Sequence, residues 1–256
     1  MKSVEFLSGR YPVKAVFSEK LDYDRYEGWA DSQKRIGILE KFLHTPISNI
    51  VGAFESHSSS IRLVTLDHPE GVTVHVDERY TMGEAGGYDG LVTDVPGVMI
   101  YLWTADCIPL YLYDPIHHVC AMAHNGWRGI CGGITQNALR VMNERFGTQA
   151  EDVVAVIGPC ICESCYEVGE ELLESFAEHF GQQTAPDFFT EAENGKHLLN
   201  IKKALLFDLH QLGVRSENIF DVGICSYEND AYASYRRDGE SRPAGQTFSG
   251  IVLEEL

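Results

Sequence analysis

Three apolar, β-rich runs follow one another in the middle of this chain, and they limit its fold more than any other feature. The runs cover residues 95–104, 110–113 and 119–124. Each is apolar almost throughout rather than at every second position, which indicates strands covered on both faces. Asp114 and Pro115 form a turn signal between the second and third runs, so we expect these two strands to fold back on each other as a pair.

The rest of the sequence predicts more strands and several helices. Further strands are expected at residues 60–67, 72–77 and 153–157. Helices are expected where apolar residues recur on one face and a glycine follows, at residues 133–146, 168–180 and 201–212. Strands and helices interleave without a strict alternation, so the sequence predicts one mixed α/β domain.

Charge and cysteine content indicate which partners and which cellular compartment to expect. The chain carries 38 acidic and 20 basic side chains, a formal net charge of -18. Such a surface repels phosphate backbones and anionic membranes, so neither nucleic acid nor membrane is expected as a partner. The N-terminal segment shows no apolar leader. The number of cysteines, seven, is odd, which favours free thiols or metal ligands over a set of disulfides. We therefore expect a cytoplasmic protein.

Two residues near the paired strands have metal-binding chemistry. Cys107 follows the first apolar run, and His124 lies at the end of the third. If the strands pair, the thiol and the imidazole lie close together, and such donors suit Zn²⁺, although copper is possible on ligand chemistry alone. The alternatives are a buried structural cysteine with a satisfied core histidine, or a thiol nucleophile with its base.

Longer motifs around these residues resemble one known family. The stretch Thr104–Gly129 reads TADCIPLYLYDPIHHVCAMAHNGWRG, and it resembles the central signature of the YfiH family, which is also called the laccase-domain, polyphenol-oxidase-like or peptidoglycan-editing-factor family. Three further strings resemble segments of that family in the same order: YDGLVTDVPG, IGPCICESCYEVGEEL and SYRRDGE. The resemblance implies a single mixed α+β domain over residues 1–256, with a mixed β-sheet core and helices outside.

The same resemblance implies an activity and a site. The activity is purine nucleoside phosphorolysis with adenosine deamination and methylthioadenosine cleavage, so the partners are a nucleoside and phosphate; an older reading is a copper-dependent polyphenol oxidase. The site is a Zn²⁺ ion held by His, Cys and His, with Cys107 and His124 on the Cys and second His positions. Asp106 and Arg128 fall on polar positions of the motif and are the candidate catalytic residues. Arg128 also suits phosphate contact, and Trp127 suits stacking on a purine.

The first family ligand, the His of a Gln-x-His element, is less clear in this sequence. In the register that we favour, His68 stands at the Gln position and Glu70 at the His position. Side chains two residues apart in a strand lie about 6.6 Å apart on one face, so either could reach a metal. We expect His68 to be the third ligand, with Glu70 as the alternative, because imidazole suits a site that already holds a thiolate.

One other departure bears on function. Lys20 stands where the family has Arg, and it could meet phosphate only as a point charge. This leaves a catalytically degenerate metal- or nucleoside-binding protein as the alternative function.

The cysteines at 160, 162 and 165 form a CxCxxC pattern. A metal cluster is one interpretation, but ligand crowding and the lack of a fourth nearby ligand favour a loop that approaches the site. Tyr235, Arg236 and Arg237 are candidates for a further anion contact.

Overall fold

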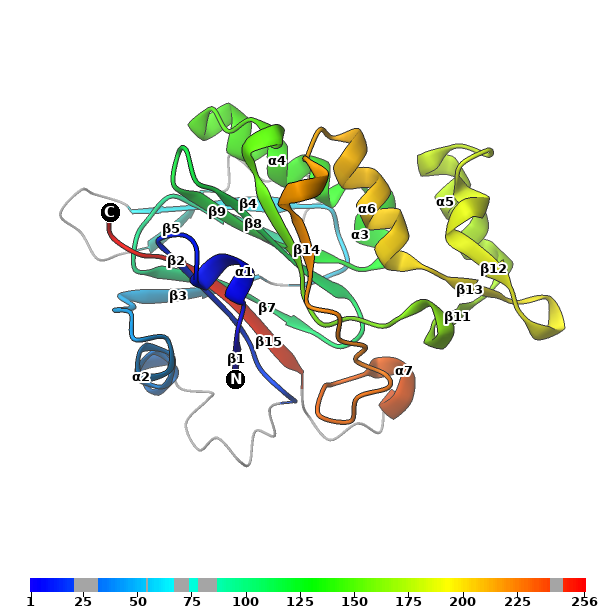
Figure 1. Cartoon of the computed structure of the whole chain (residues 1–256), viewed down its shortest axis with the longest axis horizontal. Coiled ribbons are helices and arrows are strands. Elements are labelled where there is room, and N and C mark those ends of the chain that lie inside the picture. The colour runs from blue at the N-terminus through cyan, green and yellow to red at the C-terminus, as the bar shows by residue number, and fades with distance from the viewer. Residues whose placement is uncertain (21–31, 54, 67–73, 78–86, 240–245) are drawn as a thin grey trace.

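The computed structural model describes residues 1–20, 32–53, 55–66, 74–77, 87–239 and 246–256. Two sheets pack face to face, and helices cover their outer faces (Figure 1). The expected mixed α+β fold, with a mixed β-sheet core and helices outside, is confirmed. No helix in these ranges is both long enough and apolar enough to cross a membrane.

The larger sheet contains seven strands in the order β14-β10-β8-β9-β6-β4-β5. These strands are β4 (Ile61–Leu66), β5 (Val74–Asp77), β6 (Gly90–Thr93), β8 (Ile108–Asp114), β9 (Val119–Asn125), β10 (Val154–Ile157) and β14 (Ile219–Asp221). β8 and β9 form the expected hairpin, pairing antiparallel from Ile108 with Asn125 to Asp114 with Val119. Every residue of both strands is buried, as their continuous apolar character predicted.

The second sheet contains five strands in the order β1-β2-β15-β7-β3. They are β1 (Lys2–Ser3), β2 (Val13–Phe17), β3 (Asn49–Gly52), β7 (Val98–Thr104) and β15 (Thr247–Leu253). Side chains alternate between the two faces of each strand, so β8 turns Tyr111 and Tyr113 toward this second sheet and Leu110 and Leu112 toward the helices. The hairpin thus lies in the middle of a layered molecule.

Helices complete the layers on both sides. The described helices are α1 (Glu5–Ser8), α2 (Ser32–Leu43), α3 (Trp127–Cys131), α4 (Ile134–Phe146), α5 (Glu170–Phe180), α6 (Ile201–Gln211) and α7 (Tyr235–Asp238). α4 and α6 pack on the seven-stranded sheet, and α2 packs on the five-stranded sheet (Figure 1). The three expected helices are confirmed as α4, α5 and α6, and Asn200 caps α6 by accepting a hydrogen bond from the backbone N–H of Lys203.

A smaller unit stands beside the main layers. β11 (Glu167–Val168), β13 (His197–Leu199) and β12 (Phe189–Glu191) form a three-stranded sheet next to α5 (Figure 1). Short 3-10 turns join the elements in this half of the chain, at Ala150–Asp152, Glu163–Cys165, Ala185–Phe188, Glu193–Gly195 and Ser216–Asn218. α5 begins at Glu170, two residues later than expected, because Val168 belongs to β11 and Gly169 adopts an extended backbone before the helix.

Candidate metal centre

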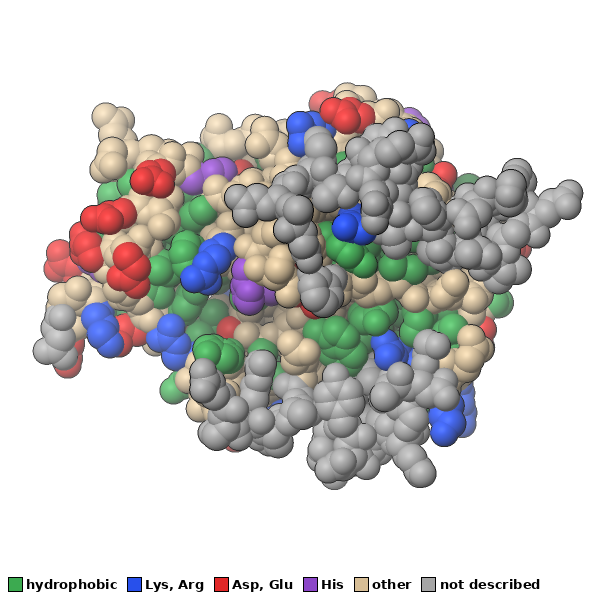
Figure 2. All heavy atoms as spheres, turned by 180° about the vertical axis from the view of Figure 1, so that it is seen from behind, with side chains coloured by type: hydrophobic (Ala, Val, Ile, Leu, Met, Phe, Trp, Pro, Cys, Tyr) green, Lys and Arg blue, Asp and Glu red, His purple; other side chains and the backbone are tan. Residues whose placement is uncertain are grey.

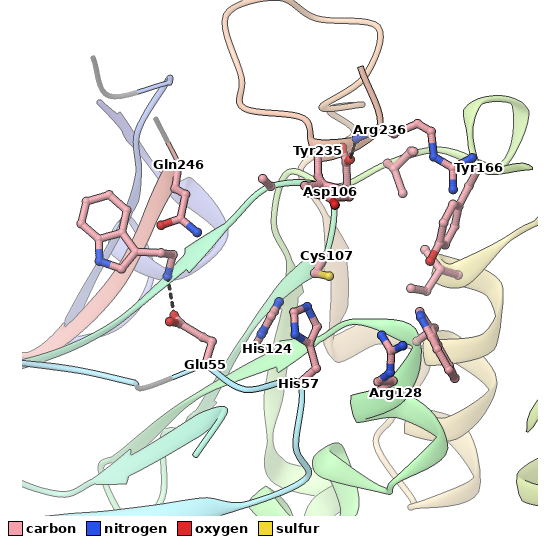
Figure 3. A pocket seen from close by; sticks show the side chains of 15 residues that line it. Glu55, His57, Asp106, Cys107, His124, Arg128, Tyr166, Tyr235, Arg236 and Gln246 are labelled. Atoms are coloured by element: carbon pink, nitrogen blue, oxygen red, sulfur yellow. Dashed lines mark hydrogen bonds between the residues drawn. The ribbon is translucent and has the colours of Figure 1, made fainter. Parts of the chain in front are cut away.

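Three potential metal ligands meet where β8 begins and β9 ends. Cys107 directly precedes β8, and His124 is the second-last residue of β9, where it pairs with Pro109 of β8. His57 lies between β3 and β4. One ligand atom from each residue lies within 4.8 Å of the other two. Figure 3 shows the Cys107 sulfur above the two imidazole rings, at the wall of a cavity. The hairpin therefore places Cys107 beside His124, and a loop from elsewhere supplies a second imidazole.

His57 was not selected by the sequence reasoning, whereas His68 and Glu70 lie outside the described residues. A signal for His57 is present in the sequence: Glu55, Ser56 and His57 have the spacing of Gln-x-His, with Glu in place of Gln. This tripeptide follows β3, and the register chosen above placed the element after β4, one strand later.

A buried carboxylate fixes the geometry of both imidazole-bearing segments. Asp89, which precedes β6, is fully buried and accepts a hydrogen bond from Nδ1 of His124 at 2.9 Å. Its two oxygens also accept hydrogen bonds from the backbone N–H groups of Ser56, His57 and Ser58, at 3.0, 3.0 and 2.7 Å. One side chain thus holds the His57 loop and leaves Nε2 of His124 free to face the cysteine.

The ionisation of these groups follows from their contacts. Burial alone would raise the pKa of Asp89, but hydrogen bonds from His124 and Ser58 outweigh it and lower the pKa to about 2. Burial also raises the pKa of the Cys107 thiol, but its interactions with His124 and then His57 bring that pKa down to about 7. Burial lowers the pKa of His124, and its bonds to Asp89 and Cys107 raise it to about 10. The site stabilises a thiolate near neutral pH, and a thiolate is the form that binds a metal.

A glycine leaves room for the thiol. A Cβ atom at Gly126, the residue before α3, would lie 2.8 Å from the sulfur of Cys107. Such a contact is far shorter than van der Waals distance, so any larger residue would displace the sulfur.

The three ligand residues line a cavity of about 540 Å³, a size that suits a small molecule. Arg128, Tyr166 and Arg236 lie across this cavity from Cys107, His57 and His124 (Figure 3). Trp127 also lines the cavity. The Arg128 guanidinium lies 4.2 Å from the centre of the Trp127 ring. Trp127 and Arg128 are the first two residues of α3. Both line the same cavity as His124, so the two residues that the sequence suggested for substrate contact do reach it.

Asp106 also lines the cavity, and it joins three segments. Its backbone has a φ of 87°, a conformation that Asp tolerates better than most residues. Its carboxylate accepts hydrogen bonds from the Ser226 hydroxyl and from the backbone N–H of Arg236, both at 2.7 Å. Its carbonyl accepts a third from the backbone N–H of Ile161 at 3.0 Å. Asp106, the residue before Cys107, therefore holds the loops that carry Ile161, Ser226 and Arg236 against this end of β8.

The remaining predicted cations divide into two groups. Arg236 reaches the cavity and lies 5.4 Å from the Tyr166 ring centre. Arg237 instead donates hydrogen bonds to the backbone carbonyls of Ser226, Tyr227 and Tyr232. Lys20 is not among the described residues of the cavity wall, and its ammonium lies 3.3 Å from an Asp238 oxygen.

The acidic charge of the chain is unevenly spread. Figure 2 shows red side chains gathered at the end of the molecule formed by α5 and β11–β13. The exposed acids on α5 are Glu170, Glu171, Glu174 and Glu178. The cavity itself is lined by two arginines, Arg128 and Arg236, and by two acids, Glu55 and Asp106, so cations that could meet an anion are present in this acidic protein.

Comparison with known proteins identifies the family of this chain. The family model described as multi-copper polyphenol oxidoreductase laccase matches residues 30–254. The chain belongs to this family. Among solved structures, the YfiH protein of Bacillus licheniformis is 30% identical, with a TM-score of 0.71 over 87% of this chain and 80% of that one. The resemblance to the YfiH family is thereby confirmed.

Curated relatives within the family carry enzyme names. A purine nucleoside phosphorylase of Bacteroides thetaiotaomicron is 37% identical over 170 residues, which are 66% of this chain and 62% of that protein. An adenosine deaminase, RL5, from an unknown prokaryotic organism is 35% identical over 167 residues, which are 64% of this chain and 62% of that protein. The chain thus matches less than two thirds of the length of either relative.

Proposed function

We propose that the chain is a purine nucleoside phosphorylase that also deaminates adenosine, with zinc held by His57, Cys107 and His124. The observation that carries this proposal is the convergence of two imidazoles and a thiol on a cavity that also presents an aromatic ring and two arginines. Adenosine, inosine and methylthioadenosine are the expected substrates. The names of the Bacteroides and RL5 relatives support the choice of substrate class.

The donor set fits a catalytic zinc ion. Such sites use three protein ligands from His, Cys and carboxylate, and a neighbouring carboxylate commonly holds the second nitrogen of a ligand His, as Asp89 holds His124. Copper also accepts thiolate and imidazole, so the choice of zinc over copper is part of the proposal. When bound, zinc supplies a Lewis acid that stabilises negative charge on a purine or on water.

The protein's own groups would bind and orient the substrates. In phosphorolysis a phosphate oxygen attacks C1′ of the ribose while the bond from C1′ to N9 of the purine breaks. The site must therefore hold an anion beside the sugar, and the Arg128 and Arg236 guanidinium groups are the cations placed to do so. The Trp127 ring offers a face for the purine. Asp106 would position Arg236 through its backbone N–H rather than contact the substrate directly.

Nucleoside turnover tests the proposal. Purified protein is incubated with adenosine, inosine and methylthioadenosine, with and without phosphate, and the products are separated by chromatography. Phosphate-dependent release of free base by the wild type, lost in Cys107→Ala and retained in Cys131→Ala, supports a phosphorylase that uses this site. Cys131 is a suitable control because it lies on α3 outside the ligand group.

A binding protein without turnover is the second candidate, and the placement of Lys20 favours it. The ammonium that would replace the family's Arg is paired with Asp238 and does not line the cavity within the described ranges. A protein that binds zinc but converts none of the three nucleosides would decide for this alternative.

The copper oxidase reading has less support. One ligand group with imidazoles occurs among the residues that the structure describes, and a single such site lacks the copper array needed to reduce oxygen to water.

A further inference from the structure

A second group of thiols lies apart from the proposed zinc ligands. Cys162, Cys165 and Cys225 place their sulfur atoms within 4.8 Å of one another, and all three are half-buried. Two come from the CxCxxC segment, and the third comes from a loop some sixty residues later. Cys160, the remaining cysteine of that pattern, is fully buried and does not belong to the group.

The structure answers the objection that the CxCxxC segment lacks nearby ligands. Cys225 is brought beside it by a backbone bridge to Cys160, where the N–H of Cys160 donates to the Ile224 carbonyl at 3.2 Å and the N–H of Ser226 donates to the Cys160 carbonyl at 3.0 Å. Glu228 follows three residues later, and its carboxylate oxygen accepts from the Cys165 thiol at 3.6 Å. Three sulfurs and one carboxylate thus gather from two loops.

We propose that Cys162, Cys165 and Cys225 bind a second zinc ion, with the exposed Glu228 carboxylate as the fourth ligand. Sulfur atoms bound to one zinc at about 2.3 Å lie roughly 3.8 Å apart, so small side-chain rotations would bring the group to a tetrahedral site. Sulfur-rich sites with four protein ligands are closed and structural, in contrast to the open site at Cys107.

The backbone around Cys225 is already arranged for a thiolate. Its sulfur accepts a hydrogen bond from the backbone N–H of Cys162 at 3.4 Å. N–H groups directed at sulfur are the usual outer contacts of metal-bound thiolates.

The position of this second group gives it a structural task. Ile161, beside Cys162, donates its N–H to the Asp106 carbonyl, and Ser226, beside Cys225, donates its hydroxyl to the Asp106 carboxylate. Asp106 in turn precedes Cys107. A zinc ion that joins the two loops would keep both in contact with Asp106. It would thereby stabilise the position of Asp106 in the cavity wall.

Metal content measured on the full chain tests the proposal. Protein purified under reducing conditions is loaded with zinc and dialysed. Its zinc content is then measured by inductively coupled plasma mass spectrometry. We expect two zinc ions per wild-type chain and one in each of Cys162→Ser, Cys225→Ser and Cys107→Ala. Cys131→Ser removes a thiol outside both groups and should retain both ions. A zinc content in Cys225→Ser and Cys162→Ser equal to that of the wild type overturns the proposal.

Cadmium absorption gives a second readout that does not depend on the loop variants folding. Each bond between cadmium and a thiolate absorbs in the ultraviolet, and the proposal predicts four such bonds in the wild type, one at Cys107 and three at the second group. Cys107→Ala should therefore keep about three quarters of the absorbance. Its complete loss in Cys107→Ala would show that the three-cysteine group binds no metal.

Discussion

The Asp89 carboxylate accepts a hydrogen bond from Nδ1 of His124 at 2.9 Å, and both side chains are buried at the end of the β9 ladder. The same carboxylate receives the backbone N–H of His57. One acid therefore sets the ring orientation of one proposed ligand and the backbone position of another, and the predictions below begin from this contact.

Asp89→Asn should weaken zinc binding by about 10- to 100-fold, because an amide holds the imidazole less strongly and no longer raises its basicity. Competition titration with a zinc-binding dye measures the change. Asp94→Asn makes the same substitution just beyond the other end of β6, and it should leave the affinity unchanged. Equal affinities for wild type and Asp89→Asn would mean that this carboxylate does not support the ligand.

His57→Ala should lose the zinc ion held by Cys107 and His124, since the site would retain two protein ligands. His68→Ala tests the third ligand expected from the sequence, and it should keep the zinc. Elemental analysis of both variants compares the two histidines directly. Loss of zinc in His68→Ala with retention in His57→Ala would restore the ligand set inferred from the sequence.

Gly126→Ala should displace the Cys107 sulfur, because the added methyl group would lie 2.8 Å from it. We expect loss of zinc and of nucleoside turnover with little change in circular dichroism. Gly37→Ala is the matched control: it lies in α2, where an added Cβ meets no atom within 4 Å. That change should stabilise the protein by about 0.5–1 kcal/mol through helix propensity. Full zinc occupancy in Gly126→Ala would contradict the tight packing described here.

Asp208→Asn should raise stability at neutral pH. Asp208 lies on the buried face of α6, its Oδ2 has no hydrogen-bond partner among the described residues, and burial raises its pKa from 3.8 to about 6. The unfolded carboxyl loses its proton first, so the folded wild type is favoured below about pH 4 and loses this advantage as pH rises to about 6. The loss amounts to at most about 3 kcal/mol.

Urea unfolding of metal-free wild type and Asp208→Asn at pH 4 and pH 8 measures this effect. The variant should be the more stable protein at pH 8, and the two should converge at pH 4. A constant difference between them at both pH values would show that Asp208 does not titrate with a raised pKa.

Local patterns were sufficient to predict the centre of the fold. The β8–β9 hairpin follows from two apolar runs joined by Asp114 and Pro115, and the helices follow from one-sided apolar spacing with a glycine at the end. The strands β2 and β15 were not predicted, and their pairing joins residues near opposite ends of the chain. Such pairing depends on sheet order, which local periodicity does not contain.

The site divides in the same way. Cys107 and His124 were found because one hairpin carries both. His57 was missed because both residues 55–57 and residues 68–70 partly match the Gln-x-His element. The backbone contact between His57 and Asp89, which favours the first of these, depends on the folded structure. Cys225 was not joined to the CxCxxC segment because their approach depends on a backbone bridge between distant loops.

The burial of β8 and β9 on both faces has a consequence for how the protein would operate over many reaction cycles. Amide groups in such central strands exchange with solvent only when the whole molecule unfolds, whereas surface loops open far more often. Two of the proposed ligands are attached to the slowest-opening part of the chain. If the proposed function holds, the loops around the cavity could open to admit substrate and release product while the strands next to Cys107 and His124 stay closed.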